Sequence, residues 1–186
     1  TLWDFNELVN DNITLYAKWA PITATAYILE HYQQDVSGTG YTLFATENLT
    51  GITEATVIAV AASYPGFEEN TGHASRVLNG TILGDGSLVL KLYYDRNTYT
   101  VSYNSNEGSA VSPVSSVRYG AGITAPAAPT KSDYPFFGWF KKAWLTTAWD
   151  FTTDTVTADI TLYAKWAPFK TRIINTNQIE IYDVIK

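Results

Sequence analysis

A nine-residue repeat constrains the fold of this chain more than any other feature. Residues 13–21 (Ile-Thr-Leu-Tyr-Ala-Lys-Trp-Ala-Pro) recur without change at 160–168. The similarity extends upstream, because Trp-Asp-Phe at 3–5 returns at 149–151 with one residue gained between the two blocks. Self-similarity of this kind is typical of tandem arrays of small modules. We therefore expect a non-catalytic array, in which residues 1–21 close a module that begins further upstream.

The composition favours β structure and excludes several classes of protein. Aromatic residues make up 15% of the chain and charged residues only 16%, and Tyr, Trp, Thr and Val favour strands. The sequence has no Cys, so disulfides and thiolate metal sites are excluded. The net charge is −6, and residues 22–97 contain few Lys or Arg. Nucleic-acid binding and contact with an anionic membrane surface are therefore disfavoured.

The second copy of the repeat has the alternation of a half-buried strand that ends at Pro168. Its apolar face carries Ile160, Leu162, Ala164 and Trp166. Similar patterns predict strands at 99–103, 114–119 and 136–140, a turn at 106–108 and an extended connector at 125–129.

Residues 22–97 follow a similar plan. Alternation predicts strands at 27–33, 41–46 and 87–94, and Asp85-Gly86 predicts a tight turn before the last of these. Residues 53–63 are ambiguous, because their Ala content suits a short helix while Thr56 to Val60 suits a strand. We expect a short helix or an irregular turn, followed by a strand.

The motifs of residues 98–166 resemble a known family. Tyr99-Thr-Val-Ser-Tyr, Gly138-Trp139, Trp149-Asp-Phe and the closing Leu-Tyr-Ala-Lys-Trp166 are similar to the internalin-type B repeat, also called the Listeria–Bacteroides repeat. Residues 1–19 resemble the closing third of another copy. One departure is Glu107, where the family usually has Gly; another is Ser132-Asp-Tyr-Pro, where a Gly-Tyr pair is more frequent.

Residues 22–97 resemble modules of the mucin-binding-protein (MucBP) type more loosely. The resemblance depends on the strand at 27–32, Tyr64-Pro-Gly-Phe67 and Leu92-Tyr-Tyr94. Both families imply small ubiquitin-like β-grasp folds in exported bacterial surface proteins. The expected fold class is therefore α+β and β-dominated, with two tandem β-grasp modules and a partial preceding one.

The resemblances divide the chain into four parts. These are the C-terminal part of a preceding B repeat at 1–21, a MucBP-like module at 22–97, a B-repeat module at 98–168, and a tail or the start of the next domain at 169–186. Within the last part, residues 179–182 have strand character. The short linkers predict a semi-rigid array. No apolar run is long enough to span a membrane, and no signal peptide opens the sequence.

The candidate site residues are aromatic. Trp19 and Trp166 share a strand face with Ile and Leu, Trp139 follows Gly138 inside a strand, and Trp149 precedes the last strand, so these residues are expected to be structural. Trp144 interrupts the core alternation in a loop, and we predict it as the best candidate for ligand contact.

Catalytic, cofactor and metal sites are not expected. The two His residues, His31 and His73, form no recognisable nucleophile–base pattern, and His73 is predicted to be solvated. No calcium-loop motif is present.

The expected role is that of a non-catalytic stalk or spacer on the bacterial cell surface, outside the cell and anchored elsewhere in the chain. Its partners would be neighbouring modules of the same chain. The alternative is an adhesin module that binds a host glycan or protein.

Overall fold

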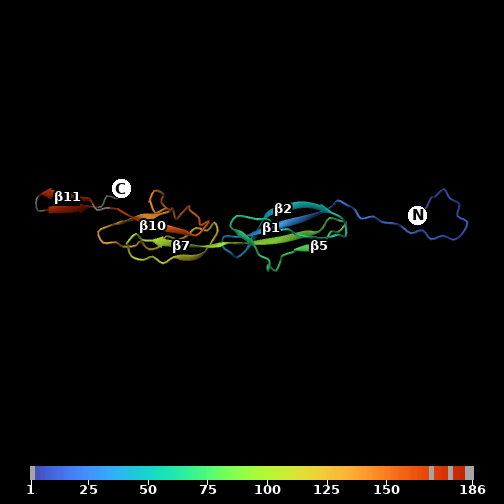
Figure 1. The fold of residues 1–186 in the computed structure, drawn as a ribbon, viewed down its shortest axis with the longest axis horizontal. Coiled ribbons are helices and arrows are strands. Elements are labelled where there is room, and N and C mark those ends of the chain that lie inside the picture. The colour runs from blue at the N-terminus through green and yellow to red at the C-terminus, as the bar shows by residue number, and fades with distance from the viewer. Residues whose placement is uncertain (1–2, 168–169, 176–177, 183–186) are drawn as a thin grey trace.

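The computed structural model describes residues 3–167, 170–175 and 178–182. These residues form strands, turns and extended segments, and no helix occurs among them. The β-dominated part of the predicted fold class is therefore confirmed. The described chain is elongated, with the segment from residue 3 to 24 at one end and the hairpin of β11 and β12 at the other (Figure 1).

The first sheet is built from four strands in the order β2-β1-β6-β4. The first and last strands of this unit, β1 and β6, are central and parallel, with Leu29 opposite Leu90. Strands β2 and β4 flank them in antiparallel pairing. A two-stranded sheet of β3 and β5 lies in the connection between β2 and β6. The strands are β1 (Thr25–Gln34), β2 (Tyr41–Gly51), β3 (Thr56–Ile58), β4 (Phe67–Glu69), β5 (Asn79–Thr81) and β6 (Val89–Arg96).

The core of the first sheet follows the alternation predicted for its last strand. Leu90, Leu92 and Tyr94 are almost fully buried and pack with Leu29 and Ala59. Successive side chains of a strand point to opposite faces, so these three residues of β6 share one face. The β3–β5 layer covers that face, since Val57 packs against the same cluster.

The second sheet repeats this strand order as β8-β7-β10-β9. Strands β7 and β10 are central and parallel, with Val101 opposite Ile160. Strand β8 pairs with β7, and β9 pairs with β10, both antiparallel. The strands are β7 (Thr98–Asn104), β8 (Val114–Arg118), β9 (Phe136–Phe140) and β10 (Ile160–Trp166). All four lie where the sequence patterns predict strands.

The second core is aromatic and separate from the first. Leu162 and Ala164 of β10 have no exposed surface, as the alternation of the repeated segment predicts. They form one cluster with the other buried residues of this sheet. Its remaining members are Val101, Val117, Ile123, Trp139, Trp149 and Val156.

The helical part of the α+β prediction is not confirmed. Residues 53–54 form a turn, and β3 follows at Thr56–Ile58, so the structure agrees with the alternative of an irregular turn and a strand. The β-branched side chains of Thr56, Val57 and Ile58 lower helix propensity and suit a strand. The corresponding connection in the second unit contains Pro126 and Pro129, and proline disrupts the interior of a helix.

The two copies of the repeated nonamer have different structures. Residues 160–166 form β10, whereas residues 13–19 pair with no strand, and Trp19 is 88% exposed. The sequence predicts a core position for Trp19, and the structure places it in solvent. The reason is that β10 depends on β7 and β9, and residues 3–24 contain no counterpart of either strand.

The tail contains an antiparallel hairpin of β11 (Lys170–Asn175) with β12 (Gln178–Tyr182). The strand character predicted for residues 179–182 is confirmed.

Candidate functional site

The junction between the two sheets is a single residue, Asn97. It separates the last residue of β6, Arg96, from the first residue of β7, Thr98. The N–H of Asn97 donates to the carbonyl of Gly66 at 2.9 Å, and its carbonyl accepts from the N–H of Tyr119 at 2.8 Å. Both backbone polar groups of the linker are therefore hydrogen-bonded, one to each sheet unit. Rotation about the linker would break these hydrogen bonds.

Arg96 connects the two units through its side chain. Its Nε donates to the carbonyl of Gln34 at 2.7 Å, and its Nη1 donates to the carbonyl of Tyr119 at 2.8 Å. The guanidinium also lies 4.8 Å from the ring centre of Phe67, within cation–π range. A planar guanidinium presents several donors in fixed directions, so Arg96 fixes the orientation of one sheet against the other.

Two glycines of the first unit receive side chains of the second. A Cβ atom on Gly66 would lie 2.2 Å from Cγ of Tyr119, and one on Gly38 would lie 2.1 Å from Cζ of Arg118. Both glycines have a φ of +77°, which other residues rarely adopt. Tyr119 also makes an edge contact with Phe67, with ring centres 5.9 Å apart. The absence of a side chain at Gly66 and Gly38 therefore makes room for Tyr119 and Arg118.

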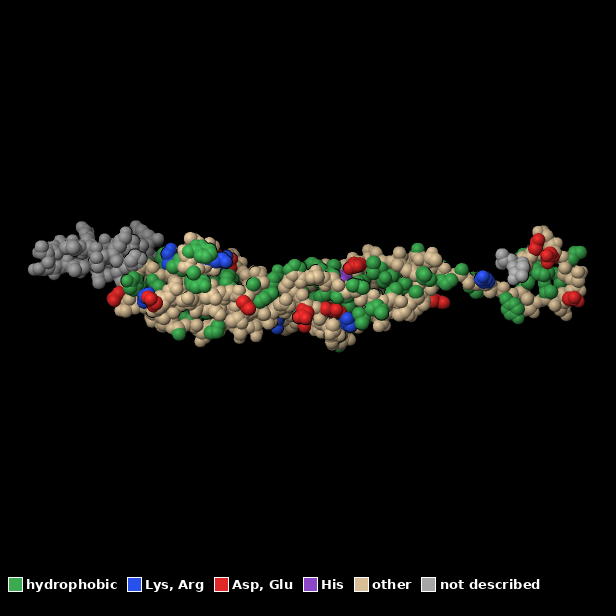
Figure 2. Space-filling model, viewed as in Figure 1, with side chains coloured by type: hydrophobic (Ala, Val, Ile, Leu, Met, Phe, Trp, Pro, Cys, Tyr) green, Lys and Arg blue, Asp and Glu red, His purple; other side chains and the backbone are tan. Residues whose placement is uncertain are grey.

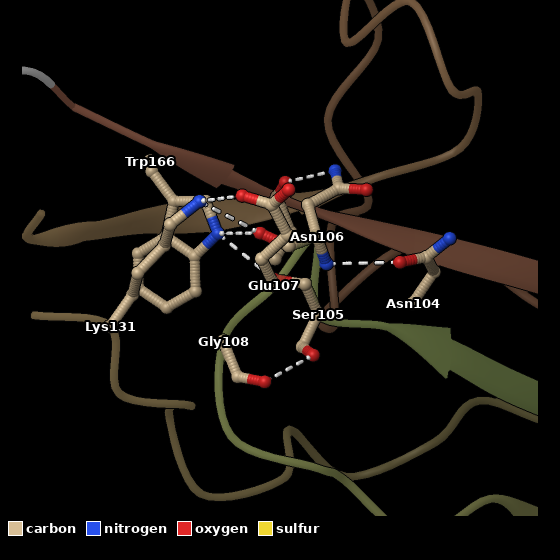
Figure 3. Close-up of polar contacts among 8 residues, drawn as sticks. Asn104, Ser105, Asn106, Glu107, Gly108, Lys131 and Trp166 are labelled. Carbon is tan, nitrogen blue, oxygen red and sulfur yellow. Dashed lines mark hydrogen bonds and ion pairs between the residues drawn. The ribbon is translucent and has the colours of Figure 1, made fainter.

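The repeat motif itself has a structural role at the far end of β10. The indole N–H of Trp166 donates to the carbonyls of Ser105 and Asn106 at 2.9 and 3.1 Å (Figure 3). The side-chain amide of Asn106 returns a bond to the carbonyl of Ala164 at 2.7 Å. The closing strand is therefore fastened to the first turn of the same unit.

Lys131 completes this arrangement. Its Nζ donates to the carbonyl of Asn106 at 3.1 Å and to the carboxylate of Glu107 at 2.9 Å (Figure 3). The hydrogen bond from Lys131 lowers the pKa of Glu107 below its usual range. Asn106 and Glu107 both have positive φ. These contacts hold the turn in a conformation that non-glycine residues seldom adopt.

The predicted site residues lie in different environments. Trp139 and Trp149 are buried in the second core, and Trp166 is half-buried at its edge. Gly138 has a φ of +150° in β9 and pairs with Lys165. Trp144 is 69% exposed.

The two His residues are held by aromatic and polar neighbours. His31 is fully buried, with Nδ1 2.9 Å from the hydroxyl of Tyr94 and Nε2 2.9 Å from the carboxylate of Glu47. His73 was predicted to be solvated, but it is half-buried and stacks on Tyr93 with ring centres 3.7 Å apart. No pattern in the sequence predicts this stacking, because the loop that carries His73 folds back over Tyr93 of β6.

The described residues contain no cluster of side chains suited to a metal ion. No group of three or more His, Asp or Glu side chains there could hold a metal ion. The described part of the chain likewise includes no helix with the length and apolar character needed to cross a membrane. On the face shown in Figure 2, acidic and basic side chains are scattered, while hydrophobic side chains follow the edge of the first unit near β2.

Comparison with known proteins identifies the second unit. The family model of the Listeria-Bacteroides repeat domain matches residues 99–165. Residues 99–165 are a Listeria-Bacteroides repeat domain. Its boundaries run from the second residue of β7 to the penultimate residue of β10, so this repeat domain coincides with the four-stranded second sheet.

Three relatives share parts of the sequence. A "Putative membrane protein" of Evansella cellulosilytica is 36% identical over 169 residues, covering 89% of this chain and 24% of that protein. A "Putative Gly-rich membrane protein" of the same organism is 50% identical over 80 residues, covering 43% of this chain and 9% of that protein. Internalin H of Listeria monocytogenes is 51% identical over 45 residues, covering 24% of this chain and 8% of that protein. The chain therefore spans less than a quarter of the length of each relative.

Proposed function

We propose that this chain is a non-catalytic spacer segment of a bacterial cell-surface protein. Its work is to hold other parts of the protein at a fixed distance and angle. The repeat domain, the similarity to Internalin H and to two proteins named as membrane proteins, and the elongated arrangement of the sheets support this role. The location that follows is the outside of the cell, with the anchor elsewhere in the protein.

The junction is the observation that carries the proposal. A flexible tether would leave the groups of its linker free, whereas Asn97 has both backbone groups bonded and Arg96 bridges the two units. Two modules with a small polar contact normally move relative to each other. Here the linker is one residue long, and Tyr119 and Arg118 pack against Gly66 and Gly38. The two sheets therefore turn as one body.

We infer that the modules are 22–97 and 98–168, with 1–21 and 169–186 as parts of neighbouring modules. The strand orders β2-β1-β6-β4 and β8-β7-β10-β9 support a β-grasp origin for both, because the first and last strands are central and parallel in each. An extended connection replaces the helix in this interpretation. The MucBP-like assignment of 22–97 rests on its sequence motifs. The partners in this role are adjacent modules of the same chain.

A pair of spin labels tests the spacer role directly. Since the chain has no Cys, Thr46→Cys and Ser112→Cys introduce two unique attachment points, both exposed and on opposite sides of the junction. Pulsed electron resonance should give one narrow distance distribution in the full chain. A broad distribution in the otherwise unchanged chain would disprove the proposal.

The matched control weakens only the junction. Adding Arg96→Ala and Tyr119→Ala removes the bridge and the ring that packs on Gly66. Because neither residue belongs to the buried clusters of either sheet, both modules should stay folded while the distance distribution broadens.

A further inference from the structure

The loop that follows β9 borders a hollow in the repeat domain. Residues 141–149 leave the end of β9 and return across it, with Lys141 N–H bonded to the carbonyl of Thr147 at 2.9 Å. The hollow has a volume of about 370 Å³ and lies between this loop and residues 154–160. Pockets for small molecules start at roughly 300 Å³, so a mono- or disaccharide is of suitable size.

The positive and negative side chains that line this hollow are equal in number. Lys141 and Lys142 line it from the loop, and Asp154 and Asp159 line it from the opposite side. Lys141 Nζ lies 2.6 Å from Oδ1 of Asp154, so these two charges neutralise each other. Oδ1 of Asp159 accepts the N–H of Thr100 at 2.7 Å, and among the described residues Oδ2 remains available as an acceptor. This balance suits a neutral ligand.

Hydroxyl and amine groups supply the remaining surface. Thr155, Thr157 and Lys142 line the hollow and are exposed. The wall also includes the largely buried Trp149. The hollow thus offers donors and acceptors side by side, as a ligand with several hydroxyl groups requires.

Trp144 stands beside the hollow on the same loop. Its ring centre lies 6.0 Å from Nζ of Lys142, which lines the hollow, and its indole is 69% exposed. The next residue, Leu145, has a φ of +55°, a conformation that costs a β-carbon residue free energy. A large apolar ring held in solvent by a strained turn has no role in the core, and strain of this kind often marks a binding site.

We propose that this hollow, with Trp144 at its rim, binds a neutral saccharide. The electron-rich face of an indole attracts the partly positive C–H groups of a sugar ring, while Thr157, Lys142 and Asp159 exchange hydrogen bonds with its hydroxyl groups. An acidic sugar or a nucleotide would meet two carboxylates without a surplus of positive charge. The inference stands apart from the spacer role, since no residue of the hollow belongs to the junction.

The test uses the full chain and defined sugars. We would screen neutral mono- and disaccharides of glucose, galactose, mannose and N-acetylglucosamine by ligand-observed NMR, and follow the strongest by amide chemical shifts. Binding is expected in the millimolar range or tighter. Trp144→Ala and Thr157→Val should each weaken it at least tenfold, while Phe44→Ala, which removes an exposed aromatic ring from β2 of the first sheet, should not change it.

Each other outcome overturns the proposal. These are no binding by any neutral sugar at 50 mM (roughly the weak limit of useful affinity), binding unaffected by Trp144→Ala, or binding of proteins alone. The melting temperature of each variant checks its fold, and since Trp144 and Thr157 are exposed no loss is expected. The spin-label distance of the Trp144→Ala variant should remain narrow, so failure here is distinguishable from failure of the spacer role.

Discussion

Arg96 donates a hydrogen bond from Nη1 to the carbonyl oxygen of Tyr119 at 2.8 Å, and thereby joins the last strand of the first sheet to the second unit. The same guanidinium bonds Gln34. Arg96→Ala should lower the free energy of unfolding by about 2 kcal/mol, because hydrogen bonds from a charged donor contribute about 1.5–3 kcal/mol. Urea unfolding measures this loss. Arg118→Ala, which removes one exposed bond to Ser37 at 3.1 Å and the packing on Gly38, should cost less than half as much; equal losses would show that Arg96 contributes no more to the junction than Arg118 does.

Gly66→Ala should destabilise the chain by about 2 kcal/mol, since it strains a residue with positive φ and displaces the ring of Tyr119. Gly72→Ala is the control, because nothing lies closer to its added Cβ than Asn70 Oδ1 at 3.8 Å. In a double-mutant cycle, Tyr119→Ala should recover part of the cost of Gly66→Ala. Strict additivity would show that the two residues do not act on each other.

Trp166→Phe should destabilise the repeat domain by about 1–3 kcal/mol, because the hydrogen bonds of the indole N–H to the carbonyls of Ser105 and Asn106 are lost and the smaller ring leaves space. The chain contains an unusually close control in Trp19→Phe, which makes the same change within an identical nonamer. Trp19 is exposed and unpaired with any strand, so its substitution should stay within about 0.5 kcal/mol of the parent. Thermal unfolding compares the two variants. Similar losses of stability would contradict the different environments of Trp166 and Trp19.

Acid should weaken the repeat domain through Asp154. The hydrogen bond from Lys141 holds the pKa of Asp154 below its usual value of 3.8. The folded chain therefore binds this proton less readily than the unfolded chain, so the stabilisation is complete above the unfolded pKa and is lost as pH falls through the folded one. Urea unfolding between pH 6 and pH 3 should show a smaller fall in stability for Asp154→Asn than for the parent. Parallel curves would exclude this contribution.

The strands of the repeat domain could be predicted because their side chains alternate. Leu162 and Ala164 point to the core, and Tyr163 between them points away, so the alternation of residues 160–166 contains the information needed to place this strand. Residues 53–63 contain no such pattern, and their β-branched side chains decided in favour of a strand over a helix. The environment of Trp19 depends on strands absent from residues 3–24, which no property of the nonamer itself can reveal.

The candidate sites were harder to predict than the strands. Trp144 departs from the core alternation, and this local signal pointed to an exposed ring. The short linker predicts a semi-rigid junction, but its side-chain contacts have no comparable signal in the sequence, because Arg96 meets Gln34 and Tyr119 across 62 and 23 residues. The positive φ of Gly38 and Gly66 is likewise a property of the folded chain. The side chains that pack against these turns become known once both sheets are placed.

The first and last strands of each unit pair in parallel, and this pairing has a mechanical consequence. In each sheet the unit begins and ends on neighbouring central strands, β1 with β6 and β7 with β10. Tension applied along the polypeptide draws these neighbours past one another lengthwise, so that the hydrogen bonds between them share the force at once instead of opening singly. Each sheet should therefore resist stretching far better than a hairpin peeled from its open end.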